Sequence, residues 1–149
     1  MPYTFYMMIT QAAPAVRNLA QWLLLNETVA GRPSETNMRA AFRVCEKLRR
    51  PLSTLAGAAG SRSLISRSLA LARSEVPWLS SVQIREDGSL EWHNETEPQL
   101  GMNETARGGI TLVSQLLGLL ATFIGEPLML RLVRDVWPDA PYNDKDSGG

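Results

Sequence analysis

The chain has 149 residues, of which 44% are hydrophobic and 20% charged, and its 15 basic and 15 acidic side chains leave no net charge. This balance is typical of one folded domain and excludes a chain that is disordered throughout. The lone cysteine, Cys45, excludes an internal disulfide, and with one histidine, His93, the chain has too few ligands for a zinc site of the Cys and His type. A neutral total gives no overall attraction to nucleic acid or membrane surfaces.

Helical patterns separated by glycine and proline fill the first half of the chain. Before them, residues 3–10 form a short apolar segment that suits either a strand or an arm packed on the body. Apolar residues then recur at helical spacing, and Pro51 is expected to break one helix from the next. The expected helices cover residues 14–30, 34–50, 52–59 and 62–75.

In the second half the spacing of apolar residues changes from helical to alternating. Apolar residues alternate on both sides of Asp87-Gly88, which predicts a β-hairpin over residues 82–92. Helices are then expected over 110–124 and 127–137, with the first beginning as early as Glu104. The sequence therefore predicts a mainly α fold, a helical bundle of about five helices with one small β-hairpin, in a single domain over 1–139 with a disordered tail over 140–149.

The segment Ile110–Ile124 is the most apolar part of the chain. A membrane-spanning helix needs about 20 apolar residues, and this run is shorter and contains polar residues such as Gln115. We therefore expect the buried axis of a bundle and no membrane span. The N-terminal residues carry no basic segment followed by a long apolar one, so a cytoplasmic location is expected.

Four small residues in this region follow helical spacing and are called the small-residue seam. Ser114, Gly118, Ala121 and Gly125 fall at i, i+4, i+7 and i+11, which places them on one helix face. Such a face lets another helix approach closely. The second helix could belong to the same chain or to a second copy in a homodimer, and the sequence leaves both open.

Charge is segregated along the chain despite the neutral total. Eight basic residues and one acid lie between Arg39 and Arg73, whereas seven acids and one base lie between Glu75 and Glu104. The favoured interpretation is a solvated basic face that complements the acidic hairpin of the same chain or of a neighbour. The alternative is a site for an anion or an acidic partner, and its candidate residues are Arg39, Arg43, Lys47, Arg62 and Arg67.

Part of this basic region resembles a known DNA-binding motif. The run Leu55-Ala56-Gly57-Ala58-Ala59-Gly60-Ser61-Arg62-Ser63-Leu64-Ile65-Ser66-Arg67 is similar to the helix-turn-helix of repressor headpieces, with a turn glycine before a Ser-Arg pair. The resemblance implies a second helix that enters the major groove of DNA. Nucleic acid is thus a conceivable partner, but the zero net charge does not favour it.

No catalytic arrangement is evident in the sequence. It contains neither a G-x-S-x-G motif nor a glycine-rich loop followed by Lys-Ser or Lys-Thr, and Cys45 falls on an apolar helix stripe. We expect no enzyme activity, metal or cofactor. The leading hypothesis is a non-enzymatic regulatory or protein-interaction module that acts through a helical surface, by binding a protein partner or by self-association as a homodimer. The alternatives are a DNA-binding regulator with a degenerate helix-turn-helix near 52–69, and a small-ligand sensor with its pocket beside Gly118 and Ala121.

Overall fold

The computed structural model describes residues 14–30, 37–93 and 98–141. Four α-helices, one 3₁₀ helix and one antiparallel pair of strands lie within these residues, in the order α2 (Pro14–Ala30), α3 (Asn37–Glu75), η1 (Pro77–Ser81), β1 (Val82–Ile84), β2 (Leu90–Trp92), α4 (Met102–Ile124) and α5 (Glu126–Val136). The expected mainly α fold with a small β-hairpin is confirmed. The expected segment at 3–10 and the tail from residue 142 onward lie outside the described residues.

The expected count of about five helices is wrong, because Pro51 does not end a helix. It lies inside α3, and the chain stays helical through it while Leu48 and Leu52 are both buried in the core. A proline inside a helix forgoes one backbone hydrogen bond, a cost that this buried packing offsets. The break occurs at Gly57, whose φ of 81° and ψ of 165° are not helical.

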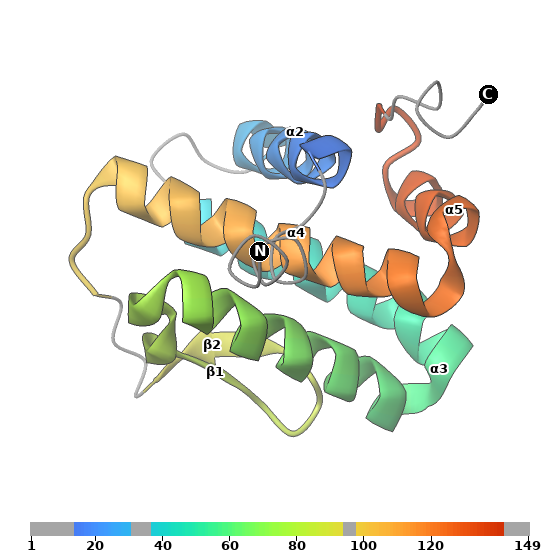
Figure 1. Ribbon diagram of the computed structural model, residues 1–149, viewed down its shortest axis with the longest axis horizontal. Helices are drawn as coiled ribbons and strands as arrows, with labels where there is room; N and C mark the ends of the chain where they lie inside the picture. The colour runs from blue at the N-terminus through green and yellow to red at the C-terminus, as the bar shows by residue number, and fades with distance from the viewer. Residues whose placement is uncertain (1–13, 31–36, 94–97, 142–149) are drawn as a thin grey trace, which may run out of the picture.

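Gly57 divides α3 into two arms that run back along each other. Figure 1 shows the first arm passing behind α4 and the second returning in the opposite direction in front of the hairpin. The hydroxyl of Ser61 donates to the carbonyl of Arg49 at 3.5 Å, which joins the two arms close to their turn. Glycine suits the turn because its positive φ is strained for other residues.

Helix α4 is the axis of the molecule. It crosses the middle of Figure 1, with α2 on one side, α3 on the other and α5 packed at its C-terminal end. The largest fully buried side chains come from these helices and from η1: Leu19, Leu23, Met38, Leu48, Leu52, Ile65, Leu69, Leu79, Leu112, Leu116, Leu117 and Leu120. Burying leucines of this kind contributes roughly 1.5–3 kcal/mol each, so the core is the main source of stability.

The middle of α4 is buried and its two ends are more exposed. By length and composition α4 could cross a membrane, with a mean hydropathy of 1.4, and 56% of its most apolar window is buried inside the protein. The buried residues lie between Thr105 and Leu117, together with Leu120, and the first turn is exposed, with Met102 at 81%. Beyond Leu117 most residues are half-buried or exposed. Most of α4 is thus the expected packed axis. Its C-terminal end is apolar but only partly buried.

The β-hairpin packs on the helices through aromatic side chains. Trp92 of β2 lies between Phe42 and Trp78, with ring centroids 5.3 and 6.4 Å away. Trp78 in turn lies over Gly108 of α4, where an added β-carbon would come within 2.4 Å of the indole ring. Aromatic pairs at these distances contribute about 0.5–1.5 kcal/mol beyond their burial. The two-stranded hairpin, marginal by itself, is therefore held by its neighbours.

Candidate functional site

A buried carboxylate joins α2, α3 and the end of α5. Glu27 is 2% exposed, and its Oε2 accepts hydrogen bonds from Nζ of Lys47 at 2.7 Å and from the indole Nε1 of Trp137 at 2.9 Å. Nε of Arg43 lies 3.4 Å from Oε1, and the same guanidinium donates to the Glu27 carbonyl. Two of the predicted partner-binding residues, Arg43 and Lys47, therefore serve this carboxylate. We call the group of Glu27, Arg43, Lys47 and Trp137 the Glu27 junction.

Opposing effects act on the Glu27 carboxyl. Burial raises its pKa, because an ionised group loses solvation there. The hydrogen bonds from Lys47 and Trp137, with the positive charges of Lys47 and Arg43, lower the pKa by more. The net pKa of Glu27 is below its ordinary value, so the carboxyl is ionised at neutral pH. A buried ionised group is stable only with such partners, which makes the junction a fixed feature of the fold.

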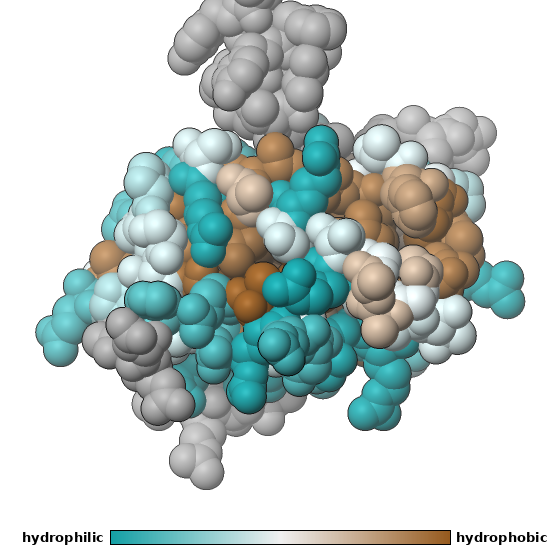
Figure 2. Space-filling view, turned by 90° about the horizontal axis from the view of Figure 1, so that it is seen from below, coloured by the Kyte–Doolittle hydropathy of each residue, from teal (hydrophilic) through white to brown (hydrophobic). Residues whose placement is uncertain are grey.

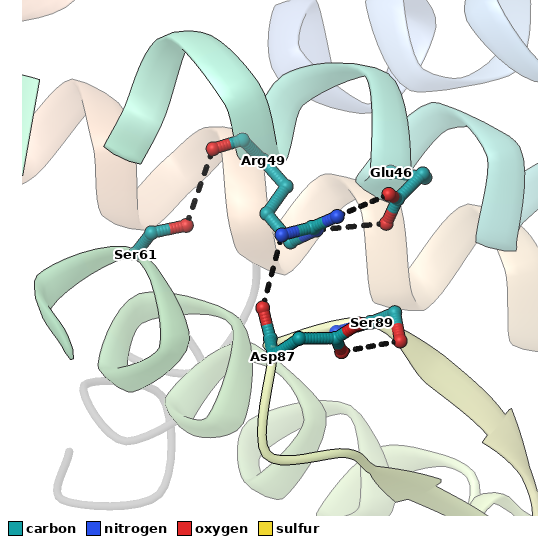
Figure 3. Close-up of polar contacts among 5 residues, drawn as sticks. All are labelled: Glu46, Arg49, Ser61, Asp87 and Ser89. Carbon is teal, nitrogen blue, oxygen red and sulfur yellow. Dashed lines mark hydrogen bonds and ion pairs between the residues drawn. The ribbon is translucent and has the colours of Figure 1, made fainter. Parts of the chain in front are cut away.

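A second polar junction attaches the hairpin turn to α3 (Figure 3). We call these contacts of Arg49 and Arg62 with the turn the hairpin junction. Arg49 makes two hydrogen bonds to Glu46 and donates through Nη1 to the carbonyl of Asp87 at 3.0 Å. Nε of Arg62 donates to the carbonyl of Arg85 at 3.2 Å. Gly88 fits tightly between them, because a β-carbon there would lie 3.2 Å from Cδ of Arg49. Part of the basic segment thus binds the acidic hairpin of the same chain, but mainly through backbone carbonyls.

The hairpin turn itself is organised by a carboxylate. Oδ1 of Asp87 accepts hydrogen bonds from the backbone N–H and the hydroxyl of Ser89, at 2.9 and 2.6 Å. These bonds favour the ionised form and hold the pKa of Asp87 below its ordinary value. Gly88 adopts a φ of 93°, which this turn requires. Both residues of the Asp-Gly pair therefore contribute to the predicted turn: Asp87 through its hydrogen bonds and Gly88 through its positive φ.

The other predicted cations lie apart from one another. Arg39 is exposed on the first arm of α3, and Arg67 is exposed on the second. Arg62 lies against the hairpin, as described above, so the segment 52–69 forms the turn of α3 and the beginning of its returning arm. The structure thus brings Arg43 and Lys47 together at Glu27, whereas Arg62 contacts the hairpin. DNA binding by this segment stays a prediction.

Residues 46–54 of α3 line a groove of about 670 Å³ that Val136 of α5 closes on one side. Its lining residues are Glu46, Lys47, Arg49, Arg50, Pro51, Ser53, Thr54 and Val136. The groove adjoins the Glu27 junction through Lys47 and the hairpin junction through Arg49. It lies between α3 and α5, not beside Gly118 and Ala121 where the ligand-sensor hypothesis placed a pocket.

The small-residue seam lies on the part of α4 where burial decreases. Ser114 is buried, and its hydroxyl has no hydrogen-bond partner among the described residues. Gly118, Ala121 and Gly125 are half-buried. Gly125 ends α4 with a φ of 90°, and its N–H still donates to the carbonyl of Ala121. The seam therefore leads from the core to the turn between α4 and α5.

Large apolar side chains are exposed at this turn. Phe123 is 64% exposed and Leu128 is 37% exposed, and Ile124 between them is half-buried. We call Phe123, Ile124 and Leu128 with the half-buried seam residues the α4–α5 patch. In Figure 2 hydrophobic surface gathers at the right-hand end of the molecule, where Figure 1 shows α4 turning into α5. Contiguous exposed apolar surface of this kind is typical of interaction sites.

Cys45 and His93, whose side chains are of types often used in catalysis, differ sharply in burial. Cys45 is 2% exposed, and burial raises the pKa of its thiol to about 12, which fits the expected core position. His93 is exposed at the end of the hairpin, where Nδ1 lies 2.9 Å from Oε1 of Gln83. Across the part of the chain that the structure describes, no three His, Cys, Asp or Glu residues are grouped to hold a metal ion.

Sequence reasoning missed the buried carboxylate of Glu27 and the groove cation Arg50. Glu27 falls four residues after Leu23, within the apolar stripe of α2, and a carboxylate in such a stripe was the available signal. Arg50 continues the spacing of Arg43 and Lys47 by three residues but was not grouped with them. No family model, curated protein or solved structure matches this chain.

Proposed function

We propose that the chain is a non-enzymatic regulatory or protein-interaction module that acts through the α4–α5 patch, and that the patch binds a second copy of the chain. The observation that carries the proposal is the exposure of the large apolar side chains of Phe123 and Leu128 at the turn between α4 and α5. Water contact with these side chains is unfavourable, and covering them would stabilise an assembly by roughly 25 cal/mol for each Å² of apolar surface removed from water.

The α4 part of the patch carries no charge, which favours a second copy over a different partner. The sequence from Gly108 to Gly125 contains no Asp, Glu, Lys or Arg, and the first charges after it are Glu126 and Arg131 of α5. In a two-fold symmetric dimer the same surface faces itself, so any charge near the axis would meet its own like charge. An uncharged apolar surface meets itself without repulsion. A patch for a charged partner would instead carry complementary charges at its centre.

The seam supplies the shape that close helix pairing needs. Gly118, Ala121 and Gly125 present little more than backbone, which lets a facing helix approach closely. Phe123 projects from a different face of α4 than the seam, because it is two residues after Ala121. With Leu128 it provides the large exposed side chains at the same end of the helix, where an aromatic side chain can anchor an interface.

The test is the oligomeric state of the full chain, measured by light scattering over a wide concentration range. We expect a concentration-dependent dimer, and we expect Phe123→Glu to weaken it by about a hundredfold or more, because two-fold symmetry places the new charge in the interface twice. The matched control is Leu25→Glu. Leu25 has the same 64% exposure but lies on α2, so its substitution should leave dimerisation unchanged.

Two results would contradict the proposal. The wild-type chain could remain a monomer at every concentration, or both substitutions could weaken dimerisation equally. Circular dichroism of both variants checks that neither result comes from unfolding. Since both side chains are largely exposed, the fold should tolerate either glutamate.

A further inference from the structure

We propose that the groove between α3 and α5 binds a phosphate monoester. This site is separate from the α4–α5 patch and does not depend on self-association. Its central residue is Arg50, which is exposed in the groove and forms no ion pair with any described residue. A guanidinium presents several N–H donors in one plane, which matches the geometry of phosphate oxygens.

The cation beside Arg50 is fixed in place by the fold. Nζ of Lys47 lies 2.7 Å from Oε2 of Glu27, on the side of the Glu27 junction. That contact uses one of the three N–H donors of the ammonium and leaves two. A side chain already held in place loses less conformational freedom when it binds a ligand, so Lys47 is prepared for an anion.

Hydroxyl groups complete the donor set one turn further along α3. The half-buried Ser53 has no hydrogen-bond partner among the described residues, whereas Oγ1 of Thr54 donates to the carbonyl of Arg50 at 3.3 Å. A hydroxyl both donates and accepts. Ser53 is therefore free to donate to a phosphate oxygen, beside the guanidinium of Arg50 and the ammonium of Lys47.

The charges around the groove sum in favour of an anion. Lys47, Arg49 and Arg50 are the cations that line it. Lys47 is paired with Glu27 and Arg49 with Glu46. The charge of Arg50 is left over among these lining residues, so the groove attracts an anion.

The volume of the groove and its apolar lining residues favour a small ester over a macromolecule. The groove of about 670 Å³ falls in the usual range for small-molecule pockets, about 300–1,000 Å³. Pro51 and Val136 supply an apolar wall for the organic part of the ester. Nucleic acid would require cations spread over a longer surface. Arg62 lies on the hairpin side of Arg49, Arg67 lies on the returning arm of α3, and neither lines the groove.

Calorimetric titration of the full chain with phenyl phosphate at constant ionic strength tests the proposal. We expect binding that weakens as salt is raised, and a loss of about tenfold in affinity for Arg50→Ala. Ser53→Ala should cause a smaller loss. Arg67→Ala is the matched control, since it removes the same charge from an exposed position of the returning arm of α3 and should leave the affinity unchanged.

Three results would overturn the assignment. They are an absence of phenyl phosphate binding, an equal loss in the Arg50→Ala and Arg67→Ala variants, and benzoate binding as tightly as phenyl phosphate. The last would show a site for carboxylates and not for phosphate. Because Arg50 is exposed and forms no ion pair with a described residue, Arg50→Ala should remain folded, which circular dichroism verifies.

Discussion

The Glu27 junction and the hairpin junction are both built from arginine, lysine and carboxylate groups, yet they differ in burial. At the first, a carboxylate that is 2% exposed accepts hydrogen bonds from α3 and from the end of α5. At the second, Arg49 and Arg62 donate to turn carbonyls at the surface. Water can replace the lost partner at the surface but not inside. Removing a charged side chain should therefore lower the free energy of unfolding more at the Glu27 junction than at the hairpin junction.

The comparison also explains why one junction orders distant parts of the chain. Glu27 contacts residues up to 110 positions away, and without it the indole N–H of Trp137 would be buried without a partner. The hairpin, by contrast, has a second attachment in the contacts of Trp92 with Phe42 and Trp78. We expect the polar contacts of the hairpin to set its position, and the aromatic contacts to supply most of its stability.

The largest expected effect comes from Glu27→Ala. The substitution leaves the Trp137 donor unsatisfied in the interior and removes the partner of Lys47, so the free energy of unfolding should fall by about 2 kcal/mol. Chemical denaturation followed by circular dichroism measures the change. An effect below that of Arg49→Ala would contradict the comparison of the two junctions.

A matched variant, Glu27→Gln, separates charge from packing. The pKa of Glu27 is lower in the folded protein than in the unfolded chain, so its contribution is fully present above the unfolded pKa. That contribution is lost as the pH falls through the folded pKa. The wild-type protein should therefore lose stability in acid more steeply than Glu27→Gln, and parallel curves would show that the carboxylate has no such role.

Gly108→Ala should have an intermediate effect, of about 1 kcal/mol. The added β-carbon would lie 2.4 Å from the ring of Trp78, and such overpacking costs about 1–3 kcal/mol, offset in part by the better helix propensity of alanine. Denaturation gives the free energy, and near-ultraviolet circular dichroism reports the displaced indole. Gly101→Ala is the control, because a β-carbon there meets nothing within 4 Å.

Arg49→Ala should have the smallest effect, of about 0.5 kcal/mol. The variant loses the Glu46 pair and the bond to the Asp87 carbonyl, but water replaces both at the surface. The control is Arg50→Ala, which removes a neighbouring cation that forms no ion pair with a described residue. The difference in unfolding free energy between the two variants isolates the contacts of Arg49. A loss as large as that of Glu27→Ala would show that exposure does not distinguish the two junctions.

Local patterns in the sequence predicted most elements and little of the site. The turn at Asp87-Gly88, the helix 14–30 and the buried Cys45 all followed from periodicity and turn chemistry. The break assigned to Pro51 was wrong, since the buried Leu48 and Leu52 keep α3 continuous there and Gly57 divides it. Ala140, assigned to the tail, is buried, and its carbonyl accepts a hydrogen bond from Arg134.

The sequence by itself determined which faces of the helices are apolar, because that depends only on spacing along the chain. It also determined that α4 would be the axis, since no other segment is as apolar. Only the tertiary structure decided which charges meet, because Glu27, Lys47 and Trp137 come from three helices far apart in sequence. The packing of those helices likewise decided that the C-terminal end of α4 is only partly buried, and that Arg50 faces a groove without an ion-pair partner among the described residues.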